Sequence, residues 1–376
     1  MKIGFFTDTY FPQVNGVTFT ISEWKNALKK HKDVELYIYY PESSYVPEEN
    51  EIPLKSVSFK FYEDYKVAVP MSRQIKNASE LDVVHIHGLF SSAILGTKIA
   101  KKFSIPCVLT YHTPADRYLR YITKSEKIQK KLKRAYNIWE RKILDRCDLI
   151  TTPSSPMKKE LAAKGFDNAI ALSNGIDLNV FKPASDSEIA EFHKKFLDKD
   201  ISDRKVAGYC GRIGYEKKLE DIIEIANDFA EEFDGVIMVA GGGPALEYYK
   251  GMAKDKGVKN IIFLGYMKRE TLRAFYSLLD VFLFPSVVET QGVVALEAMA
   301  CGVPVIGANA LAMPETVTDT VTGYLYEPGN TKELMEKIRD CYKNRARLSD
   351  NCLAHIKEHS VDRIIEQLLE IYGSLI

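Results

Sequence analysis

The stretch Phe284–Gly307 constrains the fold more than any other part of this 376-residue sequence. Val281–Phe284 is a short apolar run, which Pro285 stops. After Gly292 the apolar residues recur at helical spacing, and Val303–Ile306 then forms a second short apolar run. A strand, a loop, a short helix and another strand in direct succession are typical of an α/β chain with a parallel sheet.

Polar groups gather at the start of the predicted helix. The N–H groups of Gly292, Val293 and Val294 precede the hydrogen-bonded part of the helix, where its dipole attracts anions. Glu289 lies in the loop before it, and Glu297 lies about 7 Å along the axis at ~1.5 Å rise per residue. This separation suits a ligand with hydroxyl groups at both ends and phosphates between them, such as a nucleotide-sugar. Ordinary helix capping by the two acids is the alternative.

The wider pattern of this stretch is P-S-x-x-E-x-x-G-x-x-x-x-E-A-M-A-x-G-x-P-V-I. It resembles the signature of the retaining glycosyltransferases of family four, which have the GT-B fold. The resemblance implies an α/β fold class with two facing Rossmann-like domains and a C-terminal helix that crosses back to the first. It also implies a hexosyltransferase, in which Glu289 binds sugar hydroxyls and Glu297 binds the ribose.

Length and composition limit the alternatives. The chain is too long for one ordinary core and suits two domains. Its 51 basic and 51 acidic residues give it no overall attraction to nucleic acid or to an anionic membrane. The six cysteines are scattered without a C-x-x-C pair, which indicates reduced thiols. The N-terminus has a strand pattern without a signal peptide, so we expect a cytoplasmic protein. The inner face of the plasma membrane is an alternative location. We also expect a monomer or a weak dimer.

The domain boundary falls near Asn174-Gly175, a turn signal at the start of a connector that resembles the family's N-G-x-D…F-x-P segment. We expect an acceptor-side domain over residues 1–175, completed by the C-terminal helix 360–376. The nucleotide-sugar-binding domain then covers residues 176–359.

Two features of the first domain are candidates for binding and chemistry. Gly16 follows the first strand and its loop, where a glycine lets the backbone approach a ligand; a plain turn glycine is an equal alternative. We assign it to donor binding. Two predicted strands end in His85, His87 and His112. T-Y-H-T resembles the family's T-x-H-T segment, whose histidine contacts the transferred sugar. We therefore predict His112 as catalytic, His87 as its support and His85 as a core residue.

The segment Asp116–Asp148 is strongly basic. From Arg117 to Arg146 it has eleven basic residues against three acidic ones, with aromatic residues between them. Two interpretations remain open. The segment is a helix packed on its domain through an apolar stripe, or it is a helix on a membrane surface, where each cation contributes ~1 kcal/mol to binding. A nucleic-acid surface lacks a supporting fold signature, so we expect no nucleic acid. The stripe consists of Ile128, Leu132, Ile138, Ile143 and Leu144. The acceptor or membrane candidates are Asp116, Arg117, Tyr118, Tyr121, Lys130, Lys131, Lys133, Arg134 and Trp139.

The second domain supplies cations. Arg212 and Lys217 lie five residues apart in a loop after a predicted strand, where they would offset charge on a leaving diphosphate. The segment resembles the family's G-R-x-x-x-E-K motif, and we predict both residues as catalytic together with Glu289. By the same resemblance Met267 lies at the base site. Because these two cations offset the charge of the leaving diphosphate, the resemblance implies no metal and no cofactor.

The donor and the acceptor follow from resemblance alone. E-T-Q-G at Glu289–Gly292 and the T-Y-H-T region look like transferases that move glucose from UDP-glucose to a diacylglycerol-type lipid. The opening F-F-T-D-T-Y-F-P-Q-V-N-G-V looks equally like members that use GDP-mannose on a lipid or glycan. We expect a UDP-hexose donor and a membrane-lipid acceptor, with retention of configuration. A non-catalytic nucleotide-sugar sensor, or a membrane or RNA-binding module around residues 117–146, are the alternatives from other classes.

Overall fold

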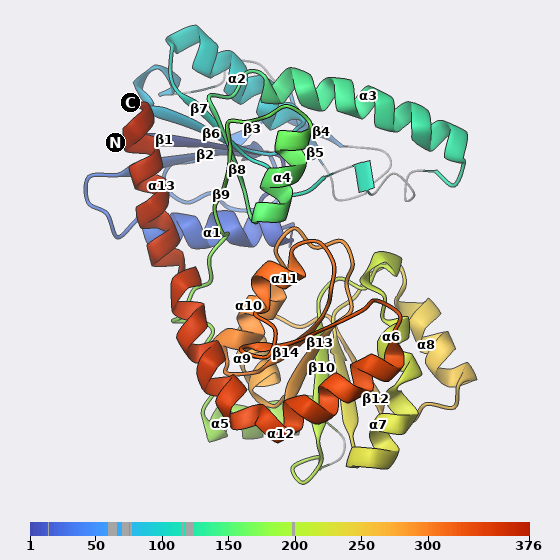
Figure 1. The fold of residues 1–376 in the computed structure, drawn as a ribbon. Coiled ribbons are helices and arrows are strands. Elements are labelled where there is room, and N and C mark those ends of the chain that lie inside the picture. The colour runs from blue at the N-terminus through green and yellow to red at the C-terminus, as the bar shows by residue number, and fades with distance from the viewer. Residues whose placement is uncertain are drawn as a thin grey trace. The chain divides into compact units, whose positions relative to one another are not determined.

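The computed structural model describes residues 1–13, 15–58, 66–69, 75, 77–114, 116–117, 123–197 and 200–376. These residues form two compact units (Figure 1). The first contains Met1–Asn174 and Val361–Ile376, and the second contains Gly175–Ser360. Each unit is a parallel sheet covered by helices, which is the α/β class predicted from the sequence.

A seven-stranded parallel sheet forms the centre of the first unit, in the order β3-β2-β1-β6-β7-β8-β9. The central strands β6 and β7 are buried over their whole length, as the continuous apolar runs of a parallel sheet require. Two short strands, β4 and β5, pair separately and antiparallel. The strands are β1 (Lys2–Thr7), β2 (Glu35–Pro41), β3 (Glu51–Leu54), β4 (Ser56–Ser58), β5 (Lys66–Ala68), β6 (Val83–His87), β7 (Cys107–Thr110), β8 (Leu149–Thr152) and β9 (Ala169–Ala171).

Helices cover both faces of this sheet. One apolar cluster joins α1 and α13 to β1 and β2, and a second joins α2, α3 and α4 to the other face. The helix α13 belongs here because its buried residues Ile364, Ile365, Leu368 and Tyr372 recur every three or four positions, which places them on one side. The helices are α1 (Gly16–Leu28), α2 (Ser91–Phe103), α3 (Glu126–Leu144), α4 (Ser155–Ala163) and α13 (Val361–Leu375).

The second unit has a six-stranded parallel sheet in the order β12-β11-β10-β13-β14-β15. In chain order this is 3-2-1-4-5-6, so the connections reverse direction between β10 and β13. Ligands of such sheets bind beyond the carboxyl ends of the strands at this switch point. The strands are β10 (Val206–Cys210), β11 (Val236–Ala240), β12 (Ile261–Gly265), β13 (Val281–Phe284), β14 (Val305–Ala308) and β15 (Gly323–Tyr326).

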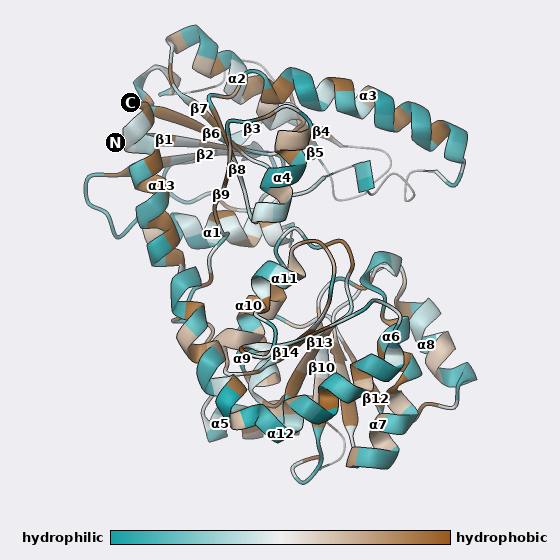
Figure 2. Cartoon of the chain, in the orientation of Figure 1, coloured by the Kyte–Doolittle hydropathy of each residue, from teal (hydrophilic) through white to brown (hydrophobic). Residues whose placement is uncertain are grey.

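Most helices of the second unit are polar on the outside and apolar toward the sheet, as Figure 2 shows for α7 and α12. The short helix α10 differs, because Ala295–Ala300 are all buried. No helix in the described part of the chain is long and apolar enough to span a bilayer. The helices are α5 (Asp186–Phe196), α6 (Glu220–Glu224), α7 (Ala226–Phe233), α8 (Leu246–Asp255), α9 (Arg269–Ser277), α10 (Val293–Ala300), α11 (Met313–Thr316) and α12 (Thr331–His355).

Candidate active site

Glycines in the loops that follow β10, β11 and β12 let the backbones of these loops pack closely and hydrogen-bond to one another. Gly241 N donates to Gly265 O at 2.7 Å, and Ile213 N donates to Gly242 O at 2.8 Å. A Cβ on Gly241 would lie 1.9 Å from the carbonyl oxygen of Gly211, and its φ of +134° also favours glycine. The loops therefore pack backbone against backbone at the carboxyl end of the sheet. The close approach of these loops therefore requires a glycine at Gly241.

The loop that follows β10, at the switch point, carries both predicted cations. Lys217 Nζ donates to Glu289 Oε1 at 2.5 Å, and the two side chains are 15% and 14% exposed. Lys217 ends the 3₁₀ turn Tyr215–Lys217 after β10, and Glu289 lies in the loop after β13. Arg212 Nη1 lies 2.9 Å from Oε1 of the buried Glu216. The structure thus brings Lys217 and Glu289 together, and it gives Arg212 an acidic partner that sequence reasoning did not single out.

The start of α10 lies in the same loop as Glu289. Gly292 is the N-cap residue, with a φ of +85°, and its carbonyl accepts from Ala295 N at 2.8 Å. The N–H groups of Val293 and Val294 therefore lie in the first turn, where an α-helix has no carbonyl partners for them. A Cβ on Gly292 would lie 3.0 Å from Met313 Sδ, so glycine also fits the packing. This end of α10 attracts anions.

Glu297 is buried inside α10 and has two internal partners. Tyr276 Oη donates to Glu297 Oε2 at 2.7 Å, and Arg269 Nη1 lies 3.6 Å from Oε1. Burial raises the pKa of the Glu297 carboxyl, while Arg269 and the Tyr276 hydroxyl act against this rise. Met267 is also buried, and its side chain belongs to the apolar cluster of the second unit. The ribose role of Glu297 and the base role of Met267 stay predictions.

Histidines lie at the carboxyl ends of β6 and β7 in the first unit. His87 Nδ1 lies 3.1 Å from His112 Nε2, and the two rings stack with centroids 5.4 Å apart. Both nitrogens of His85 have hydroxyl partners, Tyr372 at 2.5 Å and Thr110 at 2.7 Å. Desolvation lowers the pKa of His112 to about 4 and lowers the pKa values of the other two well below their usual range. His85 is a core residue, and His87 contacts His112.

Asp8, in the loop after β1, is a residue that sequence reasoning missed. Its carboxylate accepts from the backbone N–H groups of Phe90 and Ser92, both at 2.9 Å, and so closes the start of α2. Gly16 begins α1 after the cap Asn15, and among the described residues nothing lies within 4 Å of a Cβ placed on it. Its donor role therefore stays a prediction.

Comparison with known proteins identifies the chain. Residues 190–359 match the family described as "Glycosyl transferases group 1", and residues 14–180 match "Glycosyltransferase Family 4". The alpha-monoglucosyldiacylglycerol synthase of Streptococcus pneumoniae is 31% identical over 337 residues, covering 87% of this chain and 75% of that protein. The chain is a family 4 glycosyltransferase. It is therefore an enzyme, and the non-catalytic sensor and the plain membrane or RNA-binding module are set aside.

Other relatives of this glycosyltransferase differ in what they are named for. The alpha-monoglucosyldiacylglycerol synthase of Acholeplasma laidlawii is 29% identical, covering 81% of this chain and 80% of that protein. The GDP-mannose-dependent alpha-mannosyltransferase of Corynebacterium glutamicum is 24% identical, covering 100% and 89%. The crystal structure of Anabaena HepE in complex with UDP has a TM-score of 0.79 at 19% identity, covering all of both chains. This likeness confirms the predicted GT-B fold.

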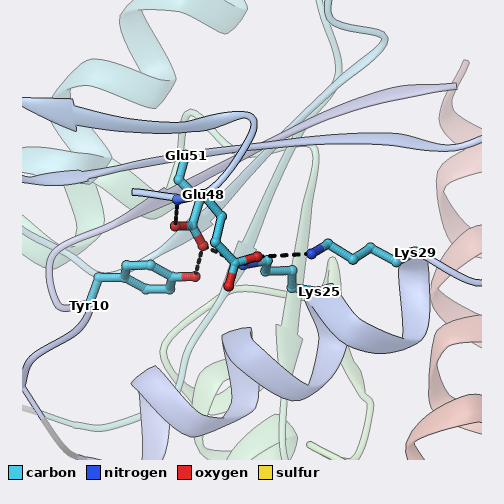
Figure 3. Close-up of polar contacts among 5 residues, drawn as sticks. All are labelled: Tyr10, Lys25, Lys29, Glu48 and Glu51. Carbon is cyan, nitrogen blue, oxygen red and sulfur yellow. Dashed lines mark hydrogen bonds and ion pairs between the residues drawn. The ribbon is translucent and has the colours of Figure 1, made fainter. Parts of the chain in front are cut away.

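A buried ion pair anchors the β1–α1 loop of the glycosyltransferase (Figure 3). Lys25 Nζ and Tyr10 Oη each lie 2.5 Å from Glu51 Oε1. Glu48 on the surface side accepts from Lys25 at 2.9 Å and from Lys29 at 3.0 Å. Since a buried charge is costly unless it is paired, these contacts fix Tyr10 and the loop around it. The sequence pattern did not indicate this network.

The basic helix α3 packs only in part as predicted, because Ile143 and Leu144 of the expected stripe are buried. Ile128 and Ile138 were expected in the packed stripe, but their side chains are 48% and 66% exposed. Tyr136 and Trp139 instead pack on the apolar cluster, and Trp139 Nε1 donates to Leu89 O at 2.7 Å. The reason is the helical period, because Ile138 lies on the side away from Tyr136, Trp139 and Ile143. Trp139 thus secures α3 to its own unit.

The other candidates of this segment are placed as follows. Asp116 pairs with Lys133 at 3.0 Å, and Arg117 pairs with Glu160 at 2.5 Å. Tyr118 and Tyr121 lie outside the described residues. The exposed basic side of α3, which we call the α3 basic face, consists of Lys127, Ile128, Lys130, Lys131, Lys133, Arg134 and Ile138.

The described residues contain no group of three or more His, Cys, Asp or Glu side chains that could hold a metal ion. The six cysteines are free and buried.

Proposed function

We propose that this glycosyltransferase moves a hexose from a UDP-sugar, UDP-glucose, to a hydroxyl of a membrane lipid and retains the anomeric configuration. The observation that carries the proposal is the switch point of the second unit. There a half-buried lysine is held by a glutamate beside the first turn of α10. A cation beside the first-turn amides of a helix suits a diphosphate leaving group.

The residues of the second unit then take distinct roles. Lys217 and Arg212 offset the charge that grows on the leaving diphosphate, and the amides at Gly292–Val294 bind its oxygens. Glu289 keeps Lys217 in place and accepts from sugar hydroxyls. Glu297 binds the ribose, and the backbone near Met267 binds the base. In the first unit we assign Gly16 to donor binding and His112 to contact with the transferred sugar. None of these roles needs a metal or a cofactor.

The α3 basic face supports a lipid acceptor. Its cations and the two exposed isoleucines combine the charge and the apolar groups that hold a helix at an anionic bilayer surface. Two relatives are named as monoglucosyldiacylglycerol synthases, which agrees with such a surface. We therefore place the enzyme as a cytoplasmic protein that binds the inner face of the membrane.

A mannosyl transfer from GDP-mannose is the second candidate. The relative from Corynebacterium glutamicum named for that donor aligns over the whole of this chain.

A donor panel separates the two candidates. The enzyme is mixed with UDP-glucose, UDP-galactose or GDP-mannose and with vesicles of diacylglycerol and anionic lipid, and the lipid product is identified by mass spectrometry. We expect a glucosyl-lipid from UDP-glucose alone. A mannosylated product, or turnover only with a soluble acceptor, would contradict the proposal.

Charge reversal on α3 tests the membrane part. Lys130→Glu with Lys131→Glu removes two cations worth ~1 kcal/mol each, so vesicle binding should weaken by about 30-fold or more. Lys194→Glu with Lys195→Glu on α5, where both lysines are exposed, is the matched control and should bind vesicles normally. Equal binding by both pairs of variants would exclude the α3 basic face as the membrane surface.

A further inference from the structure

His87 lies between two other histidines at the carboxyl edge of the first sheet. Its ring centroid is 4.3 Å from that of His85 and 5.4 Å from that of His112. Phe5 and Trp24 contact it edge-on, at 4.6 and 5.6 Å. His87 is almost completely buried, and its Nδ1 lies 3.1 Å from Nε2 of His112.

This hydrogen bond joins two neutral rings at pH 7. Burial lowers the pKa of His112 to about 4, and burial together with the neighbouring histidines lowers the pKa of His87 well below its usual range. A neutral imidazole has one N–H and one lone pair. Two arrangements are therefore open: either His112 donates from Nε2, or His87 donates from Nδ1.

The other nitrogen of His87 decides between them. Its Nε2 is buried and has no hydrogen-bond partner in the described part of the chain. If His112 donated, the proton of His87 would be on this Nε2 and a buried N–H would be left without a partner. If His87 donates, only a lone pair is left. Buried N–H groups without a partner are rarer than buried acceptors without one, and N–H contacts with aromatic rings are weak.

We propose that His87 is a positioning residue that donates its Nδ1–H to Nε2 of His112 and so keeps the proton of His112 on Nδ1. This rests on the proposed role of His112 in the transfer. Both nitrogens of His112 are then committed: Nε2 accepts from His87, and Nδ1 carries a proton. His112 can donate a hydrogen bond to a substrate oxygen, but it has no lone pair with which to take the proton of the acceptor hydroxyl. That proton must pass to another group, such as an oxygen of the leaving diphosphate.

The tautomer can be observed without turnover. The full chain is labelled with ¹⁵N-histidine, and long-range ¹H–¹⁵N NMR spectra are recorded at pH 7, with the signals of His112 assigned by their loss in His112→Gln. We expect the neutral tautomer with the proton on Nδ1. A proton on Nε2 would overturn the proposal, whether or not the protein transfers a hexose. The expected tautomer without any sugar transfer would leave this proposal standing and contradict the proposed function.

Two substitutions add a kinetic test. His87→Asn places an amide donor near the position of Nδ1, and His87→Phe keeps a ring without a donor. We expect His87→Asn to keep the His112 tautomer and kcat within a few-fold. His87→Phe should mix the tautomers and lower kcat by at least about tenfold at unchanged KM for the donor. Normal kcat in a folded His87→Phe enzyme would contradict the positioning role, and the wild-type spectrum decides the tautomer if that variant does not fold.

Discussion

Lys217 illustrates what single residues contribute to this enzyme. Its ammonium group is held 2.5 Å from Glu289, so it is placed before any ligand arrives. The family motifs singled out Lys217, Arg212 and Glu289 as candidates, because the residues of each motif are close in sequence. They could not locate Asp8, whose carboxylate binds the N–H of Phe90 82 positions away, since only the folded sheet brings those residues together.

Lys217→Ala should reduce turnover far more than stability. Loss of one group that stabilises transition-state charge typically costs about 10²–10³ in kcat. The side chain is partly exposed and outside the apolar cluster, so we expect only a small change in unfolding. Initial rates with the nucleotide-sugar and thermal unfolding measure the two effects. Lys218→Ala, at the adjacent exposed residue, is the control and should keep normal rates; near-normal turnover in Lys217→Ala would exclude its leaving-group role.

At the scale of helices and strands, hydrophobic periodicity predicts the strands but not the packed side of every helix. Most strand positions are predictable because buried parallel strands are short, continuous apolar runs. The packed side of α3 is not predictable in this way, since two isoleucines are exposed while Tyr136 and Trp139 pack on the apolar cluster. An amphipathic pattern counts apolar residues, but aromatic residues with polar groups can take the buried side when a carbonyl such as that of Leu89 receives their N–H.

The histidines at the carboxyl ends of β6 and β7 should make the stability of the first unit sensitive to acid. His85, His87 and His112 have pKa values below 6.5 when folded, so below about pH 6.5 the unfolded chain binds protons that the folded chain does not. The unfolding free energy should therefore fall as the pH falls toward 4, by up to about 1.4 kcal/mol per pH unit for each histidine. Urea unfolding followed by tryptophan fluorescence reports this unit, because Trp24 and Trp139 both belong to it.

His112→Gln is the matched variant for this measurement. It removes one of the three histidines, so the dependence on pH should become shallower by about 1.4 kcal/mol per pH unit. An unfolding free energy that stays constant between pH 7 and 5 in the parent enzyme would contradict the assignment of neutral buried histidines.

At the scale of the whole molecule, the two units have separate apolar clusters. α12 packs in the second unit, and α13, which follows it closely, packs in the first. Chain length predicted two domains, and the family resemblance implied a Rossmann-like sheet in each of them. The place of α13 came from family resemblance, because an amphipathic helix does not itself indicate which surface it covers.

Substitutions in these two helices should therefore have separate effects. Ile365→Ala in α13 removes a completely buried side chain and should cost the first unit about 2–5 kcal/mol, seen in the tryptophan transition. The affinity for UDP, measured by calorimetry, should not change. Leu348→Ala in α12 is the reciprocal control, expected to destabilise the second unit and leave the tryptophan transition in place. If either variant weakened both the tryptophan transition and the affinity for UDP to a similar extent, the separation of the two units would be contradicted.

The position of α13 also bears on how the protein is made. A ribosome completes Gly175–Ser360 before it has added the helix that covers one face of the first sheet. During that interval Ile3, Phe5 and Trp24 lack part of their cover, and His85 lacks the hydroxyl of Tyr372. The unit whose synthesis begins first is therefore the last that can reach its final form.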